Sequence, residues 1–277
     1  MFDPFLAPTP GPYKHGPDSK RQEGVPRGTV TKHEWRSEIF PGTVRDYWIY
    51  VPAQYADLPD DKDACLMVFQ DGAGYAREDT EVNTPVVFDN LIHQGRMPVT
   101  IGVYVHPGHF PPTAPDREPV DNRHFEYCTL SDHYTRFLLE EILPEVGKHY
   151  RLTEDPERRA ICGASAGGIC AWTVAWERPD SFRKVYSQIG GFNFIQDGQL
   201  YPYLIRKTPP KPIRVFLQTA CNDADFDDGN LSLANLQMAA ALEFMGYDYR
   251  FAYGDGGHSC LHGGVIMPEV LTWLWRD

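Results

Sequence analysis

The feature that most restricts the fold of this 277-residue chain is a series of short, continuously apolar runs that alternate with helical segments. Runs of this length, bounded by charged or glycine-rich turns, are typical of strands that are buried on both faces of a parallel sheet. Parallel strands also need crossover helices between them. The pattern therefore predicts an α/β fold with a mostly parallel central sheet and helices on both faces. The expected strands are residues 64–70, 97–105, 158–163, 184–191, 213–220 and 247–254, and the expected helices are 84–95, 131–149, 166–179, 233–246 and 263–275.

The beginning of the chain departs from this alternation. Residues 1–27 are rich in Pro, Gly and charge, which predicts an extended N-terminal arm. Residues 29–35 and 44–52 alternate polar with apolar side chains, so we expect two antiparallel strands at the N-terminal edge of the sheet. Residues 106–130 contain many chain breakers and predict a long loop or lid. Because no linker or repeat divides the rest, we expect a single domain over residues 28–277.

Composition excludes several classes of partner. Asp and Glu outnumber Lys and Arg by 38 to 26, a net charge of −12, so the surface repels nucleic acids and anionic lipid headgroups. No stretch reaches the roughly 18 apolar residues of a membrane span. The N-terminus also lacks the features of a signal peptide. We expect neither nucleic acid nor membrane as a partner. The location of the protein stays open: it is cytoplasmic, or secreted if a leader is missing. No cofactor and no metal are expected, and the oligomeric state stays open.

The sequence from Gly163 to Gly168, GASAGG, has the pattern G-x-S-x-G between an expected strand and a helix of small residues. In this context the serine occupies a tight strand-to-helix turn, and the flanking glycines avoid a collision across the turn. The turn projects the Ser165 hydroxyl above the sheet. The helix N-terminus directs the Ala166 N–H toward a developing oxyanion. We therefore predict that Ser165 is a nucleophile in an α/β-hydrolase fold.

A serine nucleophile needs a base and an acid, which follow it in this fold in the order acid, then histidine. His258, in a glycine-rich loop after the last expected strand, is the preferred base, and His262 is the alternative. The acid is expected after the strand that ends at residue 220. There Asp223 is the first choice and Asp225 the second. The acid would hold the imidazole tautomer and stabilise the imidazolium.

A second oxyanion donor is expected in the loop after the first apolar run, which reads DGAGY. Its glycines let the backbone turn an N–H toward the serine. Ala73 is the preferred donor, with Gly72 or Gly74 as alternatives.

Five segments together resemble the enterochelin-esterase-like family of α/β-hydrolases, which also contains feruloyl and acetylxylan esterases (carbohydrate esterase family 1) and mycolyltransferases. The segments are VFQDGAGY, NRHFEYCTLSDHYTRFLLEEILPEV, CGASAGG, NDADFDDGNLSLANLQMAAAL and GDGGHSCLHGGVIMPEVLTWLW, and the similarity covers about residues 28–276. The resemblance implies Ser165 as nucleophile, His258 as base, Asp223 as acid, and oxyanion amides at Ala73 and Ala166. It also matches Arg123 and Glu126 to an arginine–glutamate pair, as structural residues or part of the pocket wall. Ala220 departs from the pattern, where Gly is commoner, and this leaves Asp225 open as the acid.

These features predict a serine carboxylic-ester hydrolase that works through an acyl-enzyme. The resemblance implies a small-molecule or saccharide ester as substrate, carbohydrate-linked or phenolic and of feruloyl or acetyl type. An acyltransferase with the same triad and a hydrolase-fold binding module without turnover are the alternatives. Activity should rise through about pH 6–7 as a histidine base loses its proton.

Overall fold

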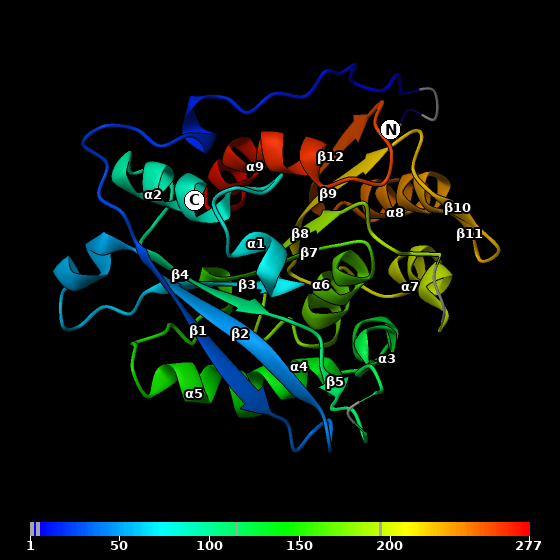
Figure 1. Ribbon diagram of the computed structural model, residues 1–277. Coiled ribbons are helices and arrows are strands. Elements are labelled where there is room, and N and C mark those ends of the chain that lie inside the picture. The colour runs from blue at the N-terminus through cyan, green and yellow to red at the C-terminus, as the bar shows by residue number, and fades with distance from the viewer. Residues whose placement is uncertain (1–2, 4–5, 115, 194–195) are drawn as a thin grey trace.

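The apolar runs of the sequence form the middle of one mixed β-sheet in the computed structural model, which describes residues 1–277 except 1–2, 4–5, 115 and 194–195 (Figure 1). The strand order is β12-β9-β8-β7-β3-β4-β2-β5-β6, and β1 pairs with β2. Every pair from β12 to β4 is parallel, whereas β2 is antiparallel to both β4 and β1. The predicted parallel sheet with antiparallel strands at its N-terminal edge is therefore confirmed. The strands are β1 (Thr29–Arg36), β2 (Val44–Val51), β3 (Cys65–Gln70), β4 (Thr100–Val105), β5 (His109–Phe110), β6 (Val120–Asp121), β7 (Arg159–Ala164), β8 (Lys184–Gln188), β9 (Arg214–Ala220) and β12 (Asp248–Gly254).

Helices cover both faces of the sheet (Figure 1). Because side chains alternate along a strand, Leu66 and Val68 of β3 point to one face, and Met67 and Phe69 to the other. The first pair belongs to an apolar cluster with α4, α6 and α8, and the second to a cluster with α2 and α9. Both faces are therefore buried, which explains the unbroken apolar run. The helices are α1 (Gly72–Tyr75), α2 (Thr84–His93), α3 (Arg123–Cys128), α4 (His133–Phe137), α5 (Leu143–Gly147), α6 (Ala166–Glu177), α7 (Tyr201–Lys207), α8 (Leu231–Met245) and α9 (Leu261–Leu274).

The helix expected over residues 131–149 is present but not uniform. It consists of α4, a π-helical turn over Leu138–Ile142, and α5. Glu141 lies in that turn, and its carboxylate accepts hydrogen bonds from Trp35 Nε1 at 2.7 Å and from the Ile39 N–H at 2.7 Å. The turn thus joins this helix to the end of β1 and to the segment between β1 and β2.

The sequence predicts a long loop or lid over residues 106–130. This prediction is only partly correct, because the segment contains β5, β6 and α3. Buried Glu126 organises this segment. Its carboxylate pairs with Arg45 of β2 at 2.6 Å and accepts the Gly108 N–H at 3.1 Å. Both charged side chains are completely buried. The segment therefore folds around an internal ion pair that involves a residue 81 positions away.

Within residues 1–27, the described part first lies beside β12 at Thr9, and residues 17–19 then contact α2 and α9 (Figure 1). The Asn90 side chain of α2 donates hydrogen bonds to the carbonyls of Asp18 and Lys20, both at 2.9 Å. Thr9 forms an isolated parallel bridge with Gly254. Among the helices of the described residues, none is both long and apolar enough to cross a membrane.

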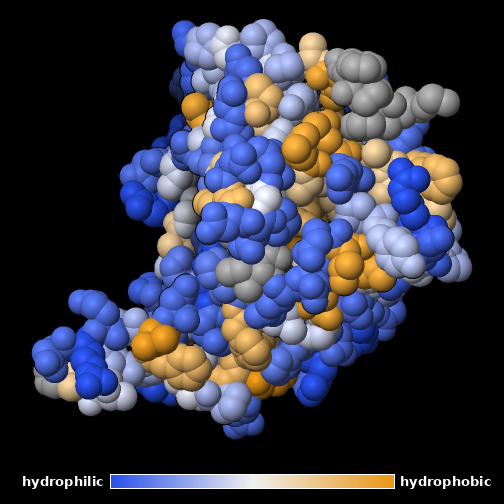
Figure 2. Space-filling model, turned by 90° about the vertical axis from the view of Figure 1, so that its right-hand side faces the viewer, coloured by the Kyte–Doolittle hydropathy of each residue, from blue (hydrophilic) through white to orange (hydrophobic). Residues whose placement is uncertain are grey.

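Figure 2 shows the face that carries α7 and α8, where hydrophobic side chains form small groups between hydrophilic ones. Large apolar side chains are exposed on both helices: Tyr203 and Leu233 keep 60% and 61% of their surface accessible. Scattered groups of this kind are ordinary on a protein surface in contact with water.

Candidate active site

Ser165 stands at a sharp turn between β7 and α6. Its backbone has φ 58° and ψ −121°, a conformation that costs energy for any residue other than glycine. A Cβ atom on Gly163 would lie 2.2 Å from the Gly167 carbonyl oxygen, and one on Gly168 would lie 2.8 Å from Ser187 Oγ. The small residues around the serine are therefore required by the close approach of the chain to itself.

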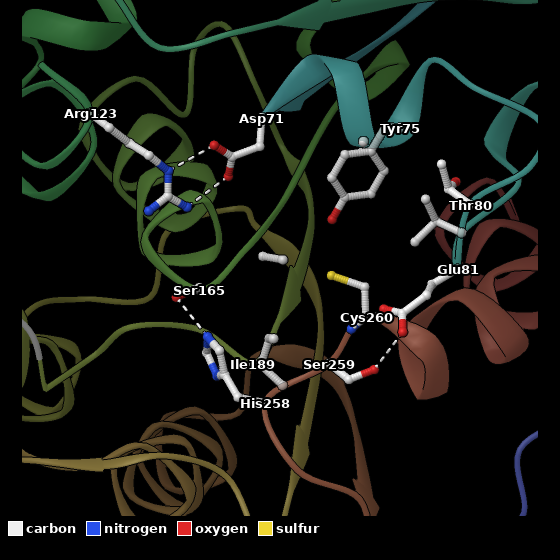
Figure 3. Close-up of a pocket in the computed structure, with 13 residues that line it drawn as sticks. Asp71, Tyr75, Thr80, Glu81, Arg123, Ser165, Ile189, His258, Ser259 and Cys260 are labelled. Carbon is white, nitrogen blue, oxygen red and sulfur yellow. Dashed lines mark hydrogen bonds and ion pairs between the residues drawn. The ribbon is translucent and has the colours of Figure 1, made fainter. Parts of the chain in front are cut away.

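The structure brings Ser165, His258 and Asp223 together, although 93 residues separate the serine from the histidine. His258 Nε2 lies 3.1 Å from Ser165 Oγ, and His258 Nδ1 lies 2.6 Å from Asp223 Oδ1 (Figure 3 shows the first contact). The loops after β9 and β12 carry the acid and the histidine. Since β9 and β12 are parallel neighbours, their carboxyl ends meet at one edge of the sheet.

Asp223 is held in place by its own loop and by the end of β9. Its side chain is fully buried, and it accepts hydrogen bonds from the Ala224 N–H at 2.8 Å and from Thr219 Oγ1 at 3.2 Å. The two alternatives lie elsewhere. Asp225 is exposed in β10 (Asp225–Phe226), which pairs with β11 (Gly229–Asn230). His262 is buried, with Nδ1 3.2 Å from Gln218 Nε2.

Arg123 and Glu126, which the resemblance matches to an arginine–glutamate pair, have different partners. Glu126 pairs with Arg45, as described above. Arg123 forms a bidentate ion pair with Asp71 at 2.7 and 2.8 Å (Figure 3). Burial alone would lower the pKa of Arg123, but its hydrogen bonds to Asp71 and the charge of that carboxylate raise it above the ordinary value. The guanidinium is therefore permanently charged at one wall of the site.

The two expected oxyanion amides differ in their surroundings. Ala166 is the first residue of α6, and the first N–H groups of a helix have no acceptor within it. The Ala73 N–H, in α1, has an acceptor, because it points to His106 Nδ1 at 3.5 Å. Burial lowers the pKa of His106, so its ring is neutral near pH 7 and has one nitrogen free to accept. That Ala73 donates to an oxyanion stays a prediction.

A pocket of about 390 Å³ opens beside Ser165. Glu81 forms part of its wall and accepts hydrogen bonds from Ser259 Oγ at 3.0 Å and from the Cys260 N–H at 2.9 Å. Burial raises the pKa of the Cys260 thiol to about 12, so this sulfur is a neutral, apolar part of the wall. The lining residues are Asp71, Gly74, Tyr75, Thr80, Glu81, Val82, Arg123, Ala164, Ser165, Ile189, His258, Ser259 and Cys260 (Figure 3).

Comparison with known proteins places this geometry in a family. The model of the family described as "Putative esterase" matches residues 40–199, which is more than half of the chain. The chain belongs to this esterase family. The match includes Ser165 and the DGAGY loop, while the loops of Asp223 and His258 lie beyond it.

One relative of this chain is the iron(III) enterobactin esterase of Dickeya dadantii, which is 24% identical over 265 residues. That alignment covers 88% of this chain and 54% of the relative. A second relative, the uncharacterised protein YbbA of Bacillus subtilis, is 22% identical and is matched over 57% of its length. The chain thus spans little more than half the length of these curated relatives.

Solved structures of esterases share the fold. The enterobactin esterase of Shigella flexneri, crystallised in the presence of enterobactin, has a TM-score of 0.72 at 21% identity over 91% of this chain and 60% of that one. A ferulic acid esterase of carbohydrate esterase family 1 from Anaeromyces mucronatus, in complex with ferulic acid, has a TM-score of 0.69 at 17% identity over 92% and 93%. The predicted α/β-hydrolase fold is confirmed.

Sequence reasoning does not identify three residues that shape the site: Asp71 as the partner of Arg123, His106 beside Ala73, and Glu81 under the histidine loop. Asp71 and His106 directly follow β3 and β4. Their position at the carboxyl ends of two parallel strands could have indicated that they lie near the site. Glu81 lies in an irregular segment before α2 and follows no local pattern.

Proposed function

We propose that this chain is a serine carboxylic-ester hydrolase that works through a covalent acyl-enzyme. The observation that carries the proposal is the continuous relay from Ser165 Oγ through His258 to Asp223, with contacts of 3.1 and 2.6 Å. Membership of the esterase family supports the same chemistry.

In the first half-reaction His258 Nε2 takes the proton of Ser165 while the serine oxygen attacks the ester carbonyl carbon. Asp223 accepts the hydrogen bond from the other ring nitrogen and stabilises the imidazolium. The carbonyl oxygen becomes an oxyanion facing the start of α6, where the Ala166 N–H and the partial positive charge of the helix end favour it. We assign the second donor to the Ala73 N–H, which would exchange His106 Nδ1 for the oxyanion.

Collapse of this intermediate expels the alcohol, which takes the proton from His258 and leaves the acyl group on Ser165. Water then enters, gives a proton to His258 and attacks the acyl carbon. The second collapse releases the carboxylic acid and returns the proton to the serine oxygen. One ester and one water molecule are consumed, and Ser165, His258 and Asp223 return to their starting state.

For the substrate, we propose an ester of a phenolic acid, attached to a sugar or to another small alcohol. Two observations support this class. One structural neighbour, a ferulic acid esterase, was crystallised in complex with ferulic acid, the acid that such an ester releases. The pocket of about 390 Å³ also presents Tyr75, Val82 and Ile189 beside Ser165, an apolar lining suited to an aromatic ring.

The test of the reaction is hydrolysis of p-nitrophenyl acetate by wild type and by Ser165→Ala. Loss of the nucleophile should lower kcat by about 10⁴-fold or more. Ser131→Ala is the matched control, because the Ser131 hydroxyl accepts a backbone N–H and does not line the pocket. Equal activity of wild type and Ser165→Ala would disprove the proposal. Release of ferulate rather than acetate from a xylan that carries both esters tests the substrate class.

A further inference from the structure

The N-terminal arm reaches the loop that carries His258. The Thr9 N–H donates to the Tyr253 carbonyl at 2.7 Å, and the Asp255 N–H donates to the Thr9 carbonyl at 3.0 Å. These two bonds give a short parallel pairing beside β12, which is the outermost strand of the sheet on this side. The arm therefore covers an edge whose N–H and C=O groups would otherwise face water.

Asp255 and Tyr13 join the arm to this loop through side chains. The Gly11 N–H lies 2.9 Å from each carboxylate oxygen of Asp255. The Tyr13 hydroxyl shares the Asp255 N–H with the Thr9 carbonyl and lies 2.7 Å from that nitrogen. Its single proton can then go to Asp255 Oδ1 at 2.9 Å or to the Thr9 carbonyl at 2.8 Å. The Asp255 backbone and side chain are thus both bound to residues of the arm.

The opposite side of the loop is bound to the segment that carries the acid. The Asn222 N–H donates to the Gly256 carbonyl at 3.1 Å, and the Asn222 side chain donates to the Asp255 carbonyl at 2.7 Å. Asn222 directly precedes Asp223. The histidine loop therefore lies between the acid loop and the arm.

The loop needs such support because of its composition. It reads Gly254-Asp255-Gly256-Gly257-His258, and glycine has the greatest backbone freedom to lose on ordering. The packing around Gly254 is tight, since a Cβ atom there would lie 2.4 Å from both the Tyr13 hydroxyl and His262 Nδ1. The Tyr13 ring also stacks on His262, with ring centroids 4.3 Å apart.

We propose that Tyr13 and Asp255 are positioning residues, which join the N-terminal arm to the histidine loop and so fix His258 at hydrogen-bond distance from Ser165. The inference rests on the proposed function. Small displacements are costly in catalysis, since a misplacement of about 1 Å can reduce a rate about 100-fold. Both the arm and the histidine loop lie outside the segment that the family model matches.

The test compares Tyr13→Phe with wild type. The phenylalanine retains the ring that stacks on His262 but loses the hydroxyl. We expect kcat for p-nitrophenyl acetate to fall about threefold to tenfold, the effect of losing one hydrogen bond, with KM within about twofold. Hydrogen–deuterium exchange of the peptide over residues 254–260 should become faster. Asp255→Asn should change both quantities in the same direction.

Tyr55→Phe is the matched control. Tyr55 is also half-buried, and its hydroxyl also accepts a backbone N–H, that of Arg151 at 2.9 Å, but it does not line the pocket. The Tyr55→Phe variant should leave kcat and the hydrogen–deuterium exchange of residues 254–260 unchanged. Wild-type kcat in Tyr13→Phe, or an equal loss of kcat in Tyr55→Phe, would overturn the inference. Unchanged exchange in Tyr13→Phe would also overturn it, whether or not the wild type cleaves esters. Absence of ester hydrolysis in the wild type would instead count against the proposed function.

Discussion

At the scale of single residues, four aspartates lie within the six positions from Asp223 to Asp228, and sequence alone does not choose between them. Their burial differs: the side chain of Asp223 is fully buried and contacts His258, whereas Asp225 is exposed in a hairpin. Only a side chain enclosed by the fold can hold the imidazole in one orientation.

Asparagine substitution should separate the two candidates. Asp223→Asn keeps the shape of the side chain but removes its charge, and we expect a loss of kcat of about 10²- to 10⁴-fold. Asp225→Asn is the control and should stay within about twofold of wild type. Steady-state kinetics with p-nitrophenyl acetate give both values. A larger loss in Asp225→Asn than in Asp223→Asn would reverse the assignment.

Asp71 also lies near the serine, and the positive charge of Arg123 balances the negative charge of its carboxylate. A Cβ atom on Gly167 would lie 3.0 Å from Asp71 Oδ2, so this carboxylate is close to the first turn of α6. Without Arg123 its negative charge would oppose an oxyanion at the same helix end. We expect Arg123→Ala to lower kcat/KM by roughly tenfold, about 1.4 kcal/mol of transition-state stabilisation.

The double variant Asp71→Asn/Arg123→Ala distinguishes this electrostatic effect from loss of packing. It removes both charges and should recover part of the activity that Arg123→Ala loses. If the double variant is no more active than Arg123→Ala in the same assay, the ion pair acts through packing or substrate contact instead.

At the scale of elements, the buried strands and the turn at Ser165 could be predicted from sequence because their signals are local. Apolar runs mark β3, β4 and β7, and the spacing of glycines marks the turn at Ser165. The strand expected to extend to residue 191 stops at Gln188, because Ile189 adopts φ 40°. The elements within residues 106–130 were not predicted, since long-range contacts such as the Arg45–Glu126 ion pair define them. The short helix α7 was not predicted either.

The nucleophile turn depends on glycine at a position with no free space. In Gly163→Ala the new methyl group would meet the backbone of α6, which cannot move without displacing Ser165. We expect destabilisation of at least about 1–3 kcal/mol, the usual cost of overpacking, together with loss of esterase activity. Urea denaturation and kinetics measure the two effects.

Gly147→Ala is the control for this prediction. Gly147 ends α5, and a Cβ atom there would meet nothing within 4 Å. Alanine also favours helix over glycine by up to about 1 kcal/mol, so stability should stay equal or rise slightly. A Gly163→Ala variant as stable as Gly147→Ala would show that the turn tolerates a side chain.

At the scale of the whole molecule, the fold encloses histidines that it must keep neutral. Burial lowers the pKa of both His106 and His262 below the ordinary value of 6.5. A histidine of this kind binds protons more readily in the unfolded chain than in the folded one. Its contribution to stability is therefore complete above about pH 6.5 and is lost as the pH falls toward the folded-state pKa.

Because these histidines bind protons more readily in the unfolded chain, we expect the free energy of unfolding to decrease as the pH is lowered from about 7.5 to about 5.5. His262→Phe retains an aromatic ring against Tyr13 but cannot titrate, so its decrease over the same interval should be smaller than that of wild type. Urea denaturation at the two pH values provides the comparison. An equal decrease in both proteins would mean that His262 does not contribute to the pH dependence.

The most direct test of the central claim is covalent labelling of the nucleophile, followed by peptide mapping with mass spectrometry. A fluorophosphonate should add one group to the peptide that contains Ser165. Labelling should be absent in Ser165→Ala and much slower in His258→Ala, which lacks the base. A labelled residue other than Ser165, or ester hydrolysis by a wild-type protein that no fluorophosphonate modifies, would contradict the account.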